Sequence, residues 1–203
     1  MKNLKFVFSL LIVGSVLLFT GCGKDDPKPE NIPETITKAT LTFTSDGVAP
    51  VIVTATDPDG DGPKPRVLSG PISLVKNTSY TLTVTLINEL AKPTDPEYNV
   101  TDEIEEEADE HIFFFAWTDN TFSNPTGNGN IDNRTDPVNY NDKDGKNLPL
   151  GLSTAWTTAN VASGIIAGTF NIMLKHQPDL KSATSKSTDG KTDLNVTFEL
   201  SVR

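Results

Sequence analysis

Two histidines and a nearby glutamate are the residues of this chain best suited to bind a transition metal. Glu107 lies four residues before His111, so a helix that continued this far would place both side chains on one face. His176 ends a separate strand pattern, and it would meet the other two residues if the two strands pair. Imidazole and carboxylate ligands suit zinc or copper. The alternative is that both histidines lie at sheet edges and hydrogen-bond to neighbouring acids.

An aspartate-rich turn is a second candidate for metal binding. Asp57, Asp59 and Asp61 alternate with other residues before Gly62, as in the first half of a calcium loop. A complete loop needs a bidentate glutamate at its twelfth position, and that position is Leu68. The pattern therefore leaves open calcium binding and a simple acidic hairpin turn.

The elements that must position these residues are β-strands. Apolar and polar residues alternate in several segments, which is typical of strands with one buried face, and turn residues separate these segments. The pattern predicts an all-β fold, an immunoglobulin-like β-sandwich of seven or eight strands, with an up-and-down barrel as the alternative. The predicted strands are residues 39–44, 51–56, 71–75, 80–86, 111–117, 150–156, 168–176 and 194–202.

Three segments depart from this alternation. Residues 111–117 are apolar on both faces, which predicts a central strand with something packed on each side. Residues 101–110 predict one short acidic helix, with Thr101 as its cap. Residues 118–149 show no apolar periodicity and predict a long polar loop. Loops of this length are usually functional or disordered, so we expect this one to contact a receptor, a ligand or a glycan.

Catalysis has little support in the sequence. There is no Gly-x-Ser-x-Gly motif, no cysteine–histidine pair and no glycine-rich phosphate loop, so we expect that the protein is not an enzyme. A glycosidase with paired carboxylates stays open. Trp117 and Trp156 lie in strand patterns, which favours packing in the core over stacking on sugar rings.

The N-terminus has the features of a secretory signal. Lys2 and Lys5 begin it, and the apolar run 6–19 is shorter than the roughly 20 residues that a membrane-spanning helix needs. Thr20 and Gly21 then precede Cys22, the only cysteine, in a pattern that resembles a bacterial lipobox. We expect Cys22 to carry a diacylglycerol and to become the new N-terminus. A transmembrane anchor, or a cysteine that merely follows the signal, are the alternatives.

The residues after Cys22 suggest how the protein is displayed. Lys24, Asp25 and Asp26 resemble the export signal of Bacteroidetes lipoproteins that reach the outer face of the outer membrane. A solvated spacer and periplasmic retention are the alternative. Three prolines between Pro27 and Pro33 favour an extended tether. The predicted organisation is a signal peptide (1–21), a lipidated cysteine with a proline-rich tether (22–34) and a β-sandwich domain (35–203).

Charge narrows the range of partners. The chain has 27 acidic and 17 basic residues and a net charge of −10 at pH 7. Such a surface repels nucleic acid and anionic lipid, and it attracts cations and basic partners. We therefore expect no nucleic-acid partner. Solubility alone would also explain the charge.

Three blocks of sequence resemble a group of Bacteroidetes outer-membrane or surface lipoproteins of uncharacterised function. They are Glu106–His111 leading into Phe113–Phe115, Leu174–Lys181, and Thr192–Phe198. Members of this group tend to be found beside outer-membrane receptors, so the resemblance implies a role in uptake. It implies no established active site.

Together these features predict a lipid-anchored outer-membrane protein that faces the cell exterior. We expect a non-enzymatic binding module, accessory to an outer-membrane uptake receptor. The alternative is a lipoprotein that captures zinc or copper through Glu107, His111 and His176, or one that binds calcium through the aspartate turn.

Overall fold

The computed structural model describes residues 34–60, 62–132, 135–160 and 166–203. The predicted signal peptide, the lipidation site Cys22 and Asp61 of the aspartate turn lie outside these residues. Within the described ranges, no helix is long and apolar enough to span a membrane.

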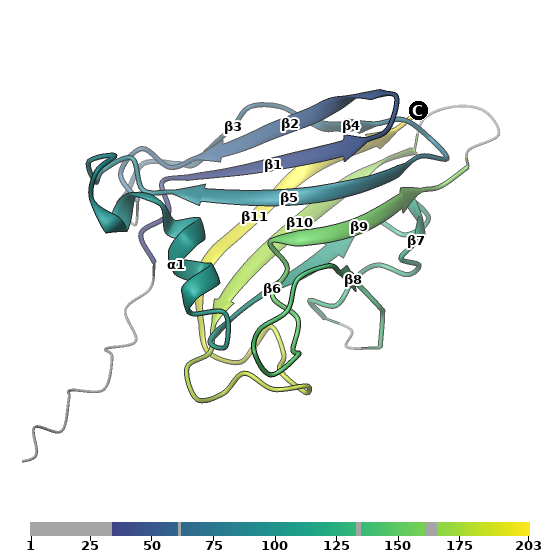
Figure 1. The fold of residues 1–203 in the computed structure, drawn as a ribbon. Coiled ribbons are helices and arrows are strands. Elements are labelled where there is room, and N and C mark those ends of the chain that lie inside the picture. Colours follow the sequence, from purple (N-terminus) through teal and green to yellow (C-terminus); the bar gives the residue numbers. More distant parts are fainter. Residues whose placement is uncertain (1–33, 61, 133–134, 161–165) are drawn as a thin grey trace, which may run out of the picture. The chain divides into compact units, whose positions relative to one another are not determined.

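Two β-sheets pack face to face, so the predicted all-β sandwich is confirmed (Figure 1). The larger sheet has the order β3-β2-β1-β5-β9-β7, with β8 also paired to β9. The smaller sheet has the order β4-β11-β10-β6. Neighbouring strands are antiparallel except for β4 and β11, which are parallel.

All eight predicted strands are present, and three short strands add to them. The larger sheet contains β1 (Lys38–Ser45), β2 (Val48–Thr56), β3 (Val67–Leu68), β5 (Ser79–Ile87), β7 (Phe122–Asn124), β8 (Asn139–Tyr140) and β9 (Ser153–Thr158). The smaller sheet contains β4 (Ile72–Leu74), β6 (His111–Trp117), β10 (Ile166–His176) and β11 (Lys191–Val202). The additional strands β3, β7 and β8 have only two or three residues each, too few to show alternation.

The core lies between the sheets and is rich in aromatic side chains. Trp156 from the larger sheet lies between Phe115 and Phe170 from the smaller one, at ring-centroid distances of 5.6 and 5.0 Å. Trp117 is also buried, and the Nε1 of Trp156 donates a hydrogen bond to Thr154. The two tryptophans therefore pack in the core, where they are unavailable for stacking on a sugar.

Strand β6 lies at the edge of its sheet, so the prediction of a central position was wrong. Its backbone is nevertheless bonded on the free side: Phe113 N donates to Leu150 O, and Asn130 N donates to Phe115 O. Gly129 permits this approach, because a Cβ there would collide with the Phe115 carbonyl. The loop thus supplies the backbone hydrogen bonds that a neighbouring strand would otherwise make.

The predicted polar loop 118–149 contains β7 and β8 and is tied to the sandwich. Asp142 accepts hydrogen bonds from the amides of Gly151 and Ser153 through its two carboxylate oxygens. The hydroxyl of Tyr140 donates to the Phe113 carbonyl at 2.7 Å. These contacts involve polar side chains with backbone groups, which apolar periodicity does not reveal.

The acidic helix α1 (Val100–Glu106) is shorter than predicted and follows a 3₁₀ turn, η1 (Pro96–Tyr98). Val100 and Ile104 are its buried residues. Thr101 does not cap the helix, because its hydroxyl bonds to the backbone of Leu86 in β5. The helix ends before Glu107, and residues 107–110 form a turn that enters β6.

The burial of core side chains predicts how two isoleucine substitutions change the free energy of unfolding. Ile172 is fully buried, whereas Ile52 on β2 is 60% exposed. We expect Ile172→Ala to lower the free energy of unfolding by about 2–5 kcal/mol, because it leaves a cavity. The matched change Ile52→Ala should stay within about 0.5 kcal/mol. Urea unfolding followed by tryptophan fluorescence measures both, and equal losses would contradict this arrangement of the sheets.

Candidate metal centre

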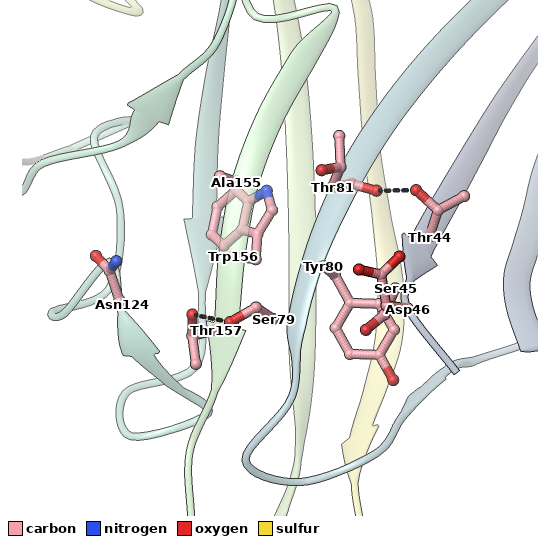
Figure 2. A pocket seen from close by; sticks show the side chains of 10 residues that line it. All are labelled: Thr44, Ser45, Asp46, Ser79, Tyr80, Thr81, Asn124, Ala155, Trp156 and Thr157. Carbon is pink, nitrogen blue, oxygen red and sulfur yellow. Dashed lines mark hydrogen bonds between the residues drawn. The ribbon is translucent and has the colours of Figure 1, made fainter. Parts of the chain in front are cut away.

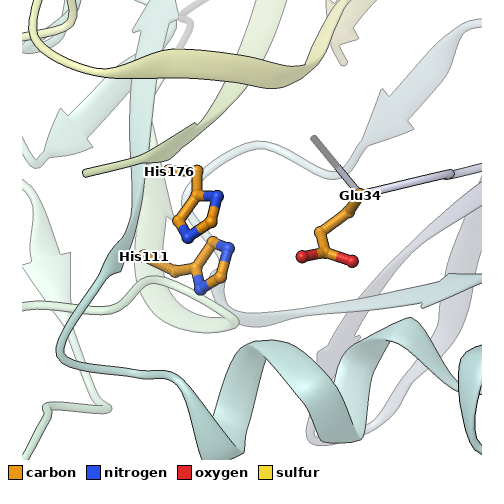
Figure 3. Close-up of side chains that lie close together, drawn as sticks. All are labelled: Glu34, His111 and His176. Carbon is orange, nitrogen blue, oxygen red and sulfur yellow. The ribbon is translucent and has the colours of Figure 1, made fainter. Parts of the chain in front are cut away.

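The structure brings the two histidines together at one end of the sandwich. In the antiparallel register of β6 and β10, His111 lies directly opposite His176. Both side chains share the inward face with core residues such as Phe113 and Leu174, since side chains alternate along a strand. Their rings stack with centroids 4.4 Å apart and an interplanar angle of 11° (Figure 3). The predicted meeting of the two strands is therefore confirmed.

Hydrogen bonds determine which ring nitrogens are free. The Nδ1 of His111 lies 3.1 Å from the Glu107 carbonyl oxygen, which only accepts, so Nδ1 carries the proton. The Nε2 of His176 lies 3.2 Å from a carboxylate oxygen of Glu110, which favours a proton on that nitrogen. The lone pairs are then on Nε2 of His111 and Nδ1 of His176. Both atoms are buried and have no hydrogen-bond partner among the described residues.

Asp193 reaches the same place through a β-bulge. Leu174 of β10 pairs with Leu194 of β11, but Lys175 pairs with Thr192, so Asp193 is the additional residue. A bulge redirects a side chain that regular alternation would send to the other face. The Asp193 side chain is fully buried, and the Glu34 backbone lies close enough to lower its pKa by hydrogen bonding.

The distance between Asp193 and His111 fits two ligands of one ion. The Oδ2 of Asp193 lies 3.8 Å from the Nε2 of His111, which is too long for a hydrogen bond. Zinc bonds of about 2.0–2.2 Å hold neighbouring ligand atoms about 3–4 Å apart. The two atoms therefore need little movement to share a metal ion.

Glu34 supplies a further carboxylate from the segment before β1. Ligand atoms of Glu34, His111 and His176 all lie within 4.8 Å of one another. In Figure 3, one nitrogen of each ring lies on the side that faces Glu34. Three residues from three segments therefore converge, and Asp193 adds a carboxylate beside His111. We call Glu34, His111, His176 and Asp193 the inner set.

The electrostatics of the inner set suit a cation. Burial, reinforced by the charge of His176, lowers the pKa of His111 to about 4, so this ring is neutral and able to bind metal near pH 7. Burial raises the pKa of Asp193 to about 6, although His176 and Lys175 oppose the shift. Burial and the charge of Glu103 raise the pKa of Glu34 to about 8. Perturbed values gathered in this way are typical of functional sites.

A second group of ligands lies on the other side of His176. Atoms of Glu107, Glu110 and His176 also lie within 4.8 Å of one another. The Glu107 side chain was predicted to join both histidines, but the group that contacts His111 is its backbone carbonyl. Burial and the charge of Glu110 raise the pKa of Glu107. We call Glu107, Glu110 and the Nε2 of His176 the outer set.

A buried ion pair holds the turn that carries the outer set. The Lys181 ammonium donates to the Ala108 carbonyl at 2.6 Å and lies 3.1 Å from Asp144. Burial raises the pKa of Asp144, but the Leu148 amide and Lys181 outweigh it, so the pKa lies below its ordinary value. Lys181 thereby joins the turn after α1 to two loops that are distant in sequence.

The aspartate turn shows no comparable convergence in its described part. Asp57 pairs with Arg66 at 3.2 Å, and Asp59 accepts the Lys64 amide. Asp61, the third predicted ligand, lies outside the described residues. The two described aspartates thus serve an ion pair and a turn, while calcium binding stays a prediction.

A polar pocket of about 400 Å³ lies at the opposite end of β1 from Glu34. Figure 2 shows that its hydroxyl groups bond within the protein: Ser79 to Thr157 at 3.0 Å, and Thr44 to the Thr81 carbonyl. These bonds leave the pocket with less capacity to bind a ligand than the histidine cluster has.

Sequence reasoning found the histidines but missed Glu34, Glu110 and Asp193 as their neighbours. Glu110 was assigned to the helix, and Glu34 to the end of the tether. For Asp193, the sequence offers one signal: an acid directly before the alternation that begins at Leu194. The bulge that turns it inward has no signature in a single sequence.

Comparisons with family models, with curated proteins and with solved structures find no match for this chain. The chemistry of the site itself therefore has to indicate the function.

The raised pKa of Glu34 predicts a pH effect in the metal-free protein. Between pH 7 and 9 the folded state loses this proton near pH 8, whereas an unfolded glutamate with an ordinary pKa is already ionised. The folded state binds more protons there, so stability should fall as pH rises through this range. Urea unfolding with a chelator present measures the fall. Glu34→Gln should flatten the profile between these pH values, and an unchanged profile would contradict the assignment.

Proposed function

We propose that this protein is a non-enzymatic binding module that holds one divalent transition-metal ion in the inner set. The observation that carries the proposal is the pair of buried imidazole nitrogens without hydrogen-bond partners, beside two carboxylates. The opposite nitrogen of each ring contacts an oxygen of Glu107 or Glu110. Such contacts orient metal-binding histidines and fix their tautomers.

The donor atoms favour zinc or copper over calcium or magnesium. Calcium and magnesium prefer oxygen ligands, whereas imidazole is a common ligand of zinc and copper. Glu34, His111 and His176 supply three ligand atoms within 4.8 Å of one another, and a small movement of Asp193 toward them would complete a tetrahedral zinc site. Catalytic zinc sites keep one position open, so a fourth protein ligand would favour binding over catalysis.

Burial supplies a second argument for a cation. A carboxylate removed from water without a partner costs several kcal/mol unless it is neutralised. Asp193 is buried beside the partly buried Glu34, whose raised pKa keeps it protonated near pH 7. An ion of charge +2 would displace that proton and compensate both carboxylates. Metal binding is therefore expected to stabilise the fold in addition to filling the site.

The sequence supports a location for this activity. The lipobox-like segment that ends at Cys22 favours a lipid anchor in the outer membrane, and the acids after it favour display on the cell surface. The resemblance to surface lipoproteins met beside outer-membrane receptors supports a role in delivering the ion to an uptake receptor. The loop 118–149 stays our proposed contact surface for that receptor.

Calorimetric titration with Zn²⁺ tests the proposal. The protein is the full-length chain in detergent with Cys22→Ser, which removes the only thiol. We expect one ion per chain, and His111→Ala or His176→Ala should weaken binding at least about 100-fold, because each removes a ligand. Asp193→Asn should also weaken binding, whereas Glu199→Gln, on an exposed position of the same strand, should not.

Circular dichroism should show that each variant is folded, and His111→Gln replaces any alanine variant that is not. Cobalt substitution gives an independent reading, since a tetrahedral site absorbs strongly in the visible range. Absence of binding by the unmutated site, or binding unaffected by both histidine changes, would refute the proposal.

A further inference from the structure

We infer that the outer set is an exchange position through which the ion enters and leaves the inner set. The inference rests on the proposed function and assigns the route to the same site. Glu107, Glu110 and His176 offer ligand atoms within 4.8 Å of one another, and His176 belongs to both sets.

The nitrogen ligands of the inner set are closed off from solvent. The His111 and Asp193 side chains are fully buried, His176 is nearly so, and Glu34 is half-buried. Both acids of the outer set reach solvent: Glu107 is partly exposed, and the Glu110 side chain is 32% exposed. An ion that loses its water in steps would meet these two carboxylates before it meets the buried nitrogens.

His176 connects the two positions because its nitrogens face different ligands. Nε2 lies beside Glu110, while Nδ1 is buried without a hydrogen-bond partner in the described part of the chain. A neutral imidazole has one lone pair, so the ring binds an ion through one nitrogen at a time. With the ion in the outer set the single ring proton is on Nδ1, and with the ion in the inner set it is on Nε2, which donates to Glu110. The ring therefore loses one proton to water and gains one from water as the ion moves, with no net change. The two positions are therefore alternatives for a single ion.

This arrangement gives the two glutamates distinguishable roles. The Glu107 carboxylate belongs only to the outer set, so its loss should raise the barrier between solvent and the inner set. Glu110 also orients His176, so its loss should weaken the inner site itself. A barrier effect changes association and dissociation equally, whereas a ligand effect appears mainly in dissociation.

Stopped-flow measurement of Zn²⁺ uptake and of its release to a chelator tests the inference. With the same full-length Cys22→Ser chain, Glu107→Gln should slow both rates by about tenfold and leave the equilibrium affinity within about threefold. Glu110→Gln should instead speed release and weaken affinity by about 10–100-fold. Glu106→Gln is the matched control, because it removes the same charge from an exposed position on α1.

Unchanged rates in Glu107→Gln, equal effects of Glu106→Gln, or two ions per chain would overturn the exchange position while leaving the inner site intact. Absence of any Zn²⁺ binding would be a failure of the proposed function instead. Slower uptake and release at unchanged affinity, confined to Glu107→Gln, is the outcome that supports the route.

Discussion

The antiparallel register between β6 and β10 is the constraint on which the site depends. It places His111 opposite His176 and gives both the same inward direction as the aromatic core. A shift of one residue would turn a whole strand over and bury its polar face. Core packing therefore holds the histidines in place: the rings that fill the sandwich also fix the register that joins the two imidazoles.

Polar contacts then close the end of the sandwich around this pair. The Glu107 carbonyl and the Glu110 carboxylate come from the turn before β6, and the bulge at Asp193 comes from β11, yet all meet the same two rings. The buried Lys181 ammonium holds the turn between α1 and β6 in place. Because strands supply both histidines and the bulged aspartate, the donor atoms have little freedom to move. A rigid scaffold of this kind lowers the cost of gathering ligands.

Much of the fold follows from the sequence, because a half-buried strand repeats every two residues. That period identified most of the longer strands and put Leu174 in the core, whereas β6 was predicted from its continuous apolar run. The period could not identify β3, β7 or β8, because strands of two or three residues are too short to show it. It also could not show that β6 lies at the edge of its sheet, where a loop makes the backbone hydrogen bonds that a further strand would make. The histidine pair was predictable because His111 begins one strand pattern and His176 ends another. Asp193 was not, because a bulge breaks the period, and Glu34 stands in a segment with no periodicity.

The stacked imidazoles are also the complete histidine content of the chain. Every imidazole resonance in a nuclear magnetic resonance spectrum therefore originates in the site, with no background from elsewhere in the molecule. Nitrogen chemical shifts of a histidine-labelled sample would report the tautomer of each ring directly. Stacking at 4.4 Å also places each ring within the ring current of the other, so both signals should move together whenever either ring turns.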